Sequence, residues 1–289
     1  MPFPNFADKH AHDAVFSPAD AVAAFLSSRV RVPQGVVLTY QPALAEHLRA
    51  TGAELRTGFP GPWRQMWRVK REGRAPVGVV NGFGVGAPAV ALVVEELIAL
   101  GAKRVINLGT AGCLQPGLDF GQVVLCTSAV RDEGVSHHYL PSAKFAYPSD
   151  ELSRLVSQEL EARQVKFTGG ATWSTDAVFR ETVAEARSYQ AEGIVTVEME
   201  AAALFAVGAF RGAEVAAAFT VSDQVLPDTP WAHAFHADAV RESSVALLEA
   251  VIDVLAGPPA DDQADLDDRG DLDDGWSAEQ PADNSSFDC

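Results

Sequence analysis

The sequence predicts an α/β fold: a single domain with a central, mostly parallel or mixed sheet flanked by helices. Short β-branched runs alternate with helical patterns along most of the chain, and this order is typical of parallel strands covered on both faces. Hydrophobic residues make up 47% of the 289 residues, which is enough for one sizeable core. The sequence shows no internal repeat and no second domain.

The first half of this domain reads as strands and helices in turn. Pro88 opens one helix and Gly101 closes it, an asymmetry that is typical of helices. Short strands in this half allow a mixed, barrel-like extension of the sheet. The predicted elements are strands at 35–40, 76–81, 103–108 and 122–127, and helices at 42–49 and 88–100.

The second half is predicted to complete the sheet and to end in a long helix. Residues 150–164 have the periodicity of an amphipathic helix. Strands are predicted at 166–173, 194–197 and 215–221. Residues 231–255 are predicted to form one C-terminal helix that packs back on the domain.

Three parts follow from this organisation: an N-terminal arm and helix at 1–34, the main domain at 35–256 and an acidic tail at 257–289. The tail carries eleven acidic residues and one arginine, Arg269, so most of the net charge of −17 is local to it. Because it combines high charge with few apolar residues, we expect this tail to be disordered.

Composition excludes several classes of function. The acidic balance argues against nucleic-acid binding, and no apolar run reaches the roughly 18 residues of a membrane span. The first residues are neither basic nor apolar, unlike a signal peptide. The cysteines Cys113, Cys126 and Cys289 are odd in number and lack metal-ligand spacing, so we expect buried thiols in a cytoplasmic protein.

The most informative segment is the junction at Glu198-Met199-Glu200, where a short β-branched run leads into an alanine-rich helix. Near a strand end, both acids can point to one side while Met199 points to the other. A first-turn charge pair would be favoured by the helix dipole. The helix that follows is almost wholly apolar and so is expected to be buried, and buried carboxylates need partners.

A second acid follows the next predicted strand. The run Val215 to Val221 ends in Ser222-Asp223, which gives a βαβ layout with carboxylates at the strand ends. In such folds ligands bind at this edge of the sheet. The alternative for Asp223 is a local role as an N-cap or in an Asx-turn.

These blocks together resemble the nucleoside phosphorylase superfamily, which includes hexameric purine nucleoside phosphorylases, uridine phosphorylases and methylthioadenosine nucleosidases. The resemblance extends from about residue 35 to 255. It is carried by Val197-Glu-Met-Glu-Ala-Ala203, Ser222-Asp223, Gly82-Phe-Gly-Val-Gly-Ala-Pro88, Glu95-Glu-Leu-Ile-Ala-Leu-Gly101 and Asn107-Leu-Gly-Thr110-Ala-Gly112. It implies that residues 35–256 form a catalytic domain of the nucleoside phosphorylase type.

The resemblance implies roles for the acids of the site. Glu200 would bind the ribose hydroxyls with Met199 packed against the sugar, while Glu198 would be the more structural of the pair. Asp223 would act as the catalytic acid by protonating or hydrogen-bonding a purine N7, for which it must hold a proton near neutral pH.

The base is expected to be of the purine type. The resemblance places a pyrimidine clamp of Gln and Arg at Thr182 and Ala184, where both are absent. Val178 and Phe179 are expected as a stacking surface, with core packing at a strand end as the alternative. The full set expected to contact the base is Ala111, Gly112, Val178, Phe179 and Val197.

The nucleophile site departs from the family pattern. The phosphate loop Gly-Asp-Pro-x-Arg of the family reads Tyr40-Gln-Pro-Ala-Leu44 here, and Asn107 stands where a phosphate-binding arginine is expected. An asparagine at this position resembles the nucleosidases, which use water as the nucleophile. Their catalytic glutamate, however, would fall near Leu44 in this sequence and is therefore missing. The groups left for phosphate are Thr110, the backbone around Gly84 and Arg131.

A polar cluster follows the strand at 122–127. Its sequence, Arg131-Asp-Glu-Gly-Val-Ser-His137-His138-Tyr139, is compatible with a pocket wall, an oligomer contact, a metal site or a solvated loop. On an extended chain adjacent histidines point apart, which argues against metal binding. His10 and His12 either reach a neighbouring subunit's pocket or belong to a disordered terminus.

These observations predict a nucleoside phosphorylase that uses phosphate as co-substrate and needs no other cofactor or metal. Hydrolysis by water is the first alternative, and a non-catalytic nucleoside-binding protein is the second. The resemblance also implies a homo-oligomer built from dimers, with a nucleoside and phosphate as the only other partners.

Overall fold

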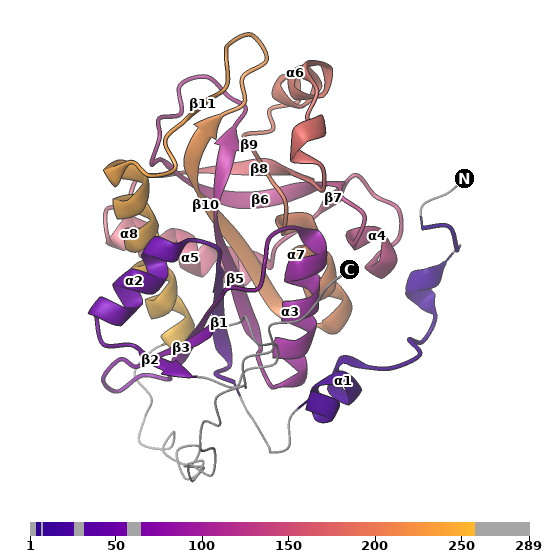
Figure 1. The fold of residues 1–289 in the computed structure, drawn as a ribbon, viewed down its shortest axis with the longest axis vertical. Coiled ribbons are helices and arrows are strands. Elements are labelled where there is room, and N and C mark those ends of the chain that lie inside the picture. The colour runs from indigo at the N-terminus through magenta and orange to yellow at the C-terminus, as the bar shows by residue number, and fades with distance from the viewer. Residues whose placement is uncertain (1–3, 7, 26–31, 57–64, 258–289) are drawn as a thin grey trace, which may run out of the picture.

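In a computed structural model, which describes residues 4–6, 8–25, 32–56 and 65–257, the chain forms a mixed sheet between two layers of helices (Figure 1). The acidic tail predicted at 257–289 lies outside these residues apart from Gly257. None of the helices in the described ranges combines the length and the apolar character needed to cross a membrane.

Eleven strands of the described chain belong to one sheet. Its order is β11-β10-β6-β8-β9-β5-β1-β4-β3-β2, with β7 paired to β6. The strands are β1 (Gly35–Thr39), β2 (Glu54–Arg56), β3 (Gln65–Val69), β4 (Val77–Asn81), β5 (Arg104–Cys113), β6 (Val123–Asp132), β7 (Phe145–Ala146), β8 (Phe167–Thr175), β9 (Thr196–Glu198), β10 (Glu214–Gln224) and β11 (Ala232–His233).

Part of this sheet closes into a ring, which confirms the barrel-like extension predicted from the sequence. The long strand β10 pairs in parallel with β5 and antiparallel with β6, while β6, β8 and β9 lead back to β5. Strands β1, β4, β5 and β10 are parallel, so their carboxyl ends meet at one edge. That edge is where ligands bind in such sheets.

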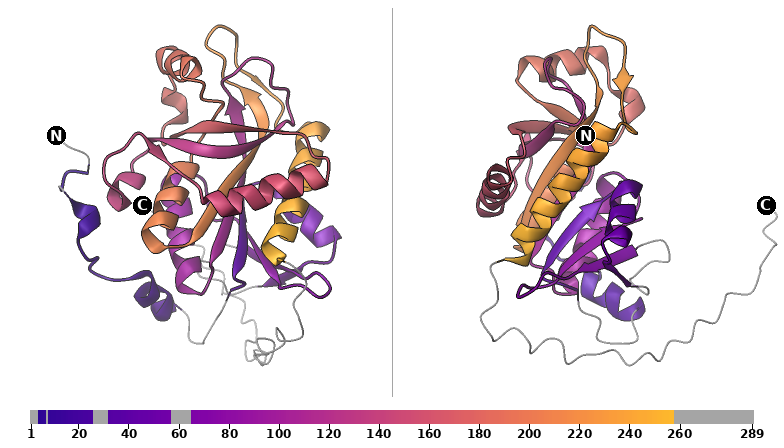
Figure 2. Two further views of the ribbon diagram at one scale, coloured as in Figure 1. Left: turned by 180° about the vertical axis from the view of Figure 1, so that it is seen from behind. Right: turned by 90° about the vertical axis from the view of Figure 1, so that its left-hand side faces the viewer.

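Helices cover both faces of the sheet (Figure 2). One core cluster joins α3 and α7 to one face, and another joins α2, α5 and α8 to the opposite face. The helices are η1 (Lys9–Ala11), α1 (Pro18–Phe25), α2 (Pro42–Ala50), α3 (Ala87–Ala99), α4 (Ser136–Tyr139), α5 (Asp150–Ala162), η2 (Val178–Arg180), α6 (Val183–Ala191), α7 (Ala201–Arg211) and α8 (Asp238–Ala256).

Helix α7 is buried along most of its length, as its apolar sequence predicts. Gly208 allows it to approach β10 closely, because a Cβ atom at that position would lie 2.6 Å from both γ-methyl groups of Val215. The alanines at the start of α7 serve the same purpose, since their small side chains let the helix lie against the sheet.

The predicted start of the C-terminal helix at residue 231 is wrong. Helix α8 begins at Asp238, and β11 occupies Ala232–His233, where it pairs antiparallel with Asp223 and Gln224. Ala237 precedes the helix in an extended conformation, and Asp238 places an acid in its first turn. Pairing with the end of β10 therefore competes successfully with helix formation over residues 231–237.

Candidate functional site

The Glu198-Met199-Glu200 junction lies where β9 ends and α7 begins, and Glu198 secures it. Its Oε2 accepts hydrogen bonds from the amides of Glu200 and Ala201, each at 2.8 Å. Its Oε1 accepts from the hydroxyl of Ser174, which in turn accepts from the Ala202 amide at 3.0 Å. Glu198 therefore satisfies the first free amides of the helix, the structural role that the resemblance implies.

Glu200 joins this junction to the glycine loop. Its Oε1 accepts a hydrogen bond of 2.5 Å from the amide of Gly86, which has a φ of +91° at the start of α3. A Cβ atom at Gly86 would lie 3.9 Å from the Cε of Met199. Two segments more than 100 residues apart thus meet at one point.

The two glutamates form a buried acidic pair, with exposed fractions of 6% and 7%. Burial, followed by the charge of Glu200, raises the pKa of Glu198 to about 8. Burial also raises the pKa of Glu200. Two carboxylates this close and this buried hold a proton near neutral pH, so the site has hydrogen-bond donors and acceptors for sugar hydroxyls.

Asn107 stands where a phosphate-binding arginine is expected, and it bonds to Tyr40, which stands at the first glycine of the family's phosphate loop. The Tyr40 hydroxyl donates to Asn107 Oδ1 at 2.8 Å, and its ring lies 5.0 Å from that of Phe83. Burial and the charges of Glu200 and Glu198 raise the pKa of Tyr40 well above its usual value, so the phenol stays neutral. The Nδ2 of Asn107 is buried without a partner among the described residues.

The three predicted phosphate groups lie on three different segments of the chain. Thr110 lies on β5, opposite Thr220 of β10, and Gly84 lies in the loop before α3 with a φ of +94°. Arg131 is buried, and its three guanidinium nitrogens donate to Ser136 Oγ and to the carbonyls of Leu140 and Pro141. These bonds give Arg131 a visible role in fixing the loop around α4.

The segment with His137 and His138 is not extended, in contrast to the conformation assumed from the sequence. Ser136–Tyr139 forms one helical turn, and Lys9 Nζ lies 3.0 Å from His138 Nδ1. The N-terminal arm therefore runs along α4 of its own chain. No group of three or more potential metal ligands occurs among the described residues.

Asp223 lies at the end of β10 beside several residues predicted to contact the base. A β-bulge between Val221 and Asp223 shifts the register with β5. A Cβ atom at Gly112 would lie 2.9 Å from Asp223 Oδ2, 2.7 Å from Val225 and 3.2 Å from Val197. The glycine therefore lets this carboxylate and the Val197 side chain both approach the β5 backbone, while the base-contact role of Val197 stays a prediction.

The remaining base-contact residues are placed differently. Ala111 is buried in the core between the sheet and α3 and α7. Val178 and Phe179 lie in η2 with 46% and 98% of their surface exposed. Core packing at a strand end, the alternative reading of these two residues, is thus wrong, while a stacking role stays a prediction.

Sequence reasoning missed two residues beside Asp223. Burial, followed by the charges of Asp223 and Glu185, raises the pKa of Glu181 to about 7. The indole Nε1 of Trp231 donates to Asp223 Oδ2 at 3.0 Å. The alternation of large side chains at 231, 233 and 235 has the period of a strand and is the signal that could have placed Trp231 in a hairpin.

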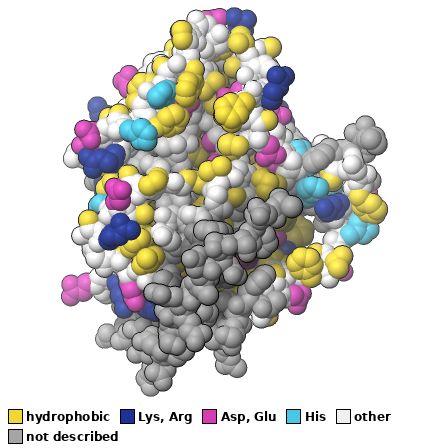
Figure 3. Space-filling view, viewed as in Figure 1, with side chains coloured by type: hydrophobic (Ala, Val, Ile, Leu, Met, Phe, Trp, Pro, Cys, Tyr) yellow, Lys and Arg dark blue, Asp and Glu magenta, His cyan; other side chains and the backbone are white. Residues whose placement is uncertain are grey.

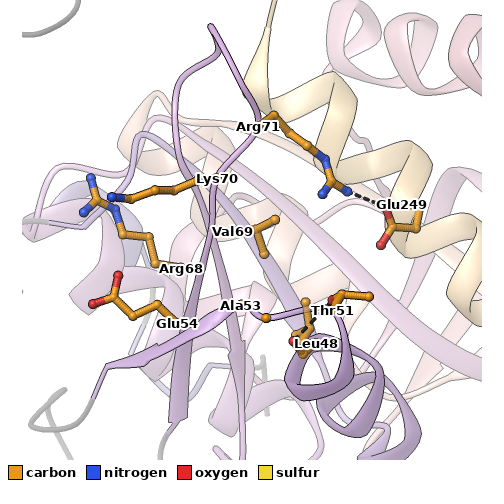
Figure 4. Close-up of a pocket in the computed structure, with 10 residues that line it drawn as sticks. Leu48, Thr51, Ala53, Glu54, Arg68, Val69, Lys70, Arg71 and Glu249 are labelled. Atoms are coloured by element: carbon orange, nitrogen blue, oxygen red, sulfur yellow. Dashed lines mark hydrogen bonds and ion pairs between the residues drawn. The ribbon is translucent and has the colours of Figure 1, made fainter.

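A separate cavity of about 250 Å³ lies on the flank of α2, β2, β3 and α8. Charged side chains of both signs line it, and Arg71 forms an ion pair with Glu249 across it (Figure 4). None of the predicted site residues lines this cavity, so the chemistry of the strand ends lies elsewhere.

Comparisons with known proteins agree with this geometry. Residues 35–256 match the family described as the phosphorylase superfamily. A uridine phosphorylase of Treponema pallidum (strain Nichols) is 34% identical over 157 residues, covering 50% of this chain and 60% of the relative. A purine nucleoside phosphorylase of the DeoD type from Caldanaerobacter subterraneus subsp. tengcongensis is 29% identical over 154 residues, covering 51% and 64%.

Solved structures extend the similarity over more of the chain. The crystal structure of a uridine phosphorylase from Vibrio fischeri ES114 has a TM-score of 0.66 at 26% identity, covering 78% of this chain and 94% of that structure. The sequence matches, in contrast, cover less than two thirds of the length of each curated relative named above.

Proposed function

Because the chain belongs to the phosphorylase superfamily, we propose that it cleaves the N-glycosidic bond of a nucleoside with phosphate. The products are a free base and a pentose 1-phosphate, and a purine-type base is favoured. The observation that carries this proposal is the buried pair of Glu198 and Glu200, joined to the glycine loop through the Gly86 amide.

This arrangement fits the charge that develops during cleavage. As the glycosidic bond breaks, positive charge builds on the ribose and negative charge on the departing base. Glu200 lies directly after β9 with Oε1 held by the Gly86 amide, and its carboxylate can still accept from a ribose hydroxyl, because each oxygen accepts more than one hydrogen bond. Glu198 holds the backbone of Glu200 through its amide, so the sugar-binding acid is fixed before substrate arrives.

Asp223 supports the purine preference. A carboxyl group at this place can donate to or accept from a polar edge of the base, and the nearby Gly112 and Val197 provide a flat, apolar boundary. The relatives include proteins named for uridine and for purine nucleosides, so substrate comparison has to decide between them. Asp223→Asn is expected to lower turnover of purine nucleosides by roughly 10²-fold or more, as for a lost general acid.

Hydrolysis is the second candidate, and the Tyr40–Asn107 pair favours it. Both side chains are neutral, and Asn107 stands where the family resemblance expects a phosphate-binding arginine. A phenol and an amide bind water at least as readily as phosphate. Family membership and the glycine-loop amides support phosphate as the nucleophile.

The test is product analysis with inosine, adenosine and uridine, each with and without phosphate. Base release that requires phosphate and yields pentose 1-phosphate would establish phosphorolysis. Release of free pentose without phosphate would establish hydrolysis. Glu200→Ala should abolish either reaction, while the exposed Glu242→Gln serves as a matched control. Nucleoside binding without any base release would favour a binding protein.

We further propose that the protein works in the cytoplasm, as a homo-oligomer built from dimers, without a metal or organic cofactor. The family resemblance supports the oligomer, and mass measurement in solution tests it. Dialysis against a chelator should leave turnover unchanged.

A further inference from the structure

Trp231 is an exposed aromatic side chain with a specific polar contact. Its surface is 59% exposed, yet its indole Nε1 donates to Asp223 Oδ2 at 3.0 Å. Large aromatic side chains are usually well buried, and exposed ones often belong to binding surfaces. The contact directs this one at the acid of the proposed base site.

The backbone holds Trp231 at this place from both sides. The amide of Val225 donates to the Cys113 carbonyl at 2.9 Å, and the amide of Ala234 donates to the Ser222 carbonyl at 2.7 Å. Residues 226–231 form the connection between these two anchors. Strand β11 directly follows Trp231 and pairs with Asp223 and Gln224 of β10.

Both oxygens of the Asp223 carboxylate already have a donor from the same chain. Oδ1 accepts from the Ser222 hydroxyl at 2.8 Å, and Oδ2 accepts from Trp231. Ser222 is 1% exposed within β10, whereas Trp231 lies at the surface. Each carboxylate oxygen can accept a further hydrogen bond, and Trp231, at the surface, is the donor that a base reaching Asp223 from solvent would meet.

Trp231 also belongs to a small aromatic group. Its ring centroid lies 4.7 Å from that of His233 and 6.2 Å from that of Phe235, and the latter two are stacked at 5.4 Å. Hydrophobic and histidine side chains gather on the face around β11 (Figure 3). Such a group offers a planar surface of the kind on which nucleobases stack.

We propose that Trp231 is a base-binding residue of this site, which gives up its bond to Asp223 when a nucleoside enters and then stacks on the base. This inference rests on the proposed function, because it needs a base at Asp223. It deepens that function by assigning the outer wall of the base site to the connection between β10 and β11.

The test compares Trp231→Phe, which keeps a ring but loses the N–H, with Trp231→Ala, which loses both. Tyr147→Ala is a matched control, because Tyr147 is 65% exposed on another part of the surface. The measurements are kcat and KM for inosine and the change in tryptophan emission when hypoxanthine is added to the unreacted protein.

We expect Trp231→Ala to raise KM roughly 10-fold or more with a smaller effect on kcat, as for loss of a base–aromatic contact. Trp231→Phe should retain most of the affinity, and both variants should lose the emission change that the wild type shows. A Trp231→Ala variant with wild-type KM and an intact emission change would overturn the role of Trp231 alone. If the wild type neither binds hypoxanthine nor releases it from inosine, this role is overturned, whereas the proposed function is overturned only if no base is released from adenosine or uridine either.

Discussion

Replacing Glu198 should separate its structural role from the chemistry of Glu200. In Glu198→Ala the amides of Glu200 and Ala201 lose their acceptor in a buried place. A buried donor left unpaired costs about 1–3 kcal/mol, so these two amides alone cost roughly 2–6 kcal/mol. That is a large share of the roughly 5–15 kcal/mol by which a domain is stable.

Glu198→Gln provides the matched comparison. The carbonyl oxygen of this glutamine can accept from both amides, and its NH2 group can donate to the Ser174 hydroxyl. The expected loss in the free energy of unfolding is therefore about 1 kcal/mol or less. Urea unfolding followed by circular dichroism measures both changes, with Glu242→Ala as a surface control. If the Ala and Gln variants unfold at the same urea concentration, Glu198 does not hold the start of α7 in the way described.

Three further outcomes are expected from packing, charge and hydrogen bonding. Gly208→Ala should cost about 1–3 kcal/mol in urea unfolding, because its Cβ would lie 2.6 Å from Val215, and Val215→Ala in the same chain should recover part of this loss. The pKa of Glu198 is raised from 4.5 to about 8, so between these values the folded state holds a proton that the unfolded chain has lost. The free energy of unfolding of the wild type should therefore fall relative to that of Glu198→Gln as pH rises from 5 to 8, by at most about 1.4 kcal/mol per pH unit. An equal pH dependence of the two urea midpoints would contradict this. Tyr40→Phe removes the bond to Asn107 and should lower kcat in the base-release assay with little change in nucleoside KM, and a change in KM alone would place Tyr40 away from the nucleophile.

The sequence allowed the fold class and the central junction to be predicted, because both depend on local patterns. Alternation of strands and helices predicted the covered sheet, and the β-branched run before an apolar helix predicted the junction at Glu198 and Glu200. The hydrogen bond from Ser174 to Glu198 could not be predicted in this way. It depends on the parallel pairing of β8 with β9, which brings together residues 24 positions apart.

The Tyr40–Asn107 contact depends on a longer-range register. Strands β1 and β5 pair so that Leu38 lies opposite Asn107, and this brings a side chain at the end of β1 back over β5. A sequence pattern shows that the expected arginines are missing, but it does not show that Tyr40 and Asn107 bond to each other. The register of β1 with β5 is what brings these two neutral side chains together.

The two halves of the site differ in how firmly they are held, and this explains which half could be predicted. Glu198 is joined to the backbone amides of the helix start directly after it, so its place follows from a short sequence motif, whereas the bond from Gly86 to Glu200 joins segments 114 residues apart. Trp231 and Phe179 lie at the surface on short connections, where a weak strand pairing outcompeted a helical pattern. Under the proposed function, the buried half with Glu198 and Glu200 would bind the sugar and the surface half the base, so a change in a few surface residues would be enough to change which base is accepted.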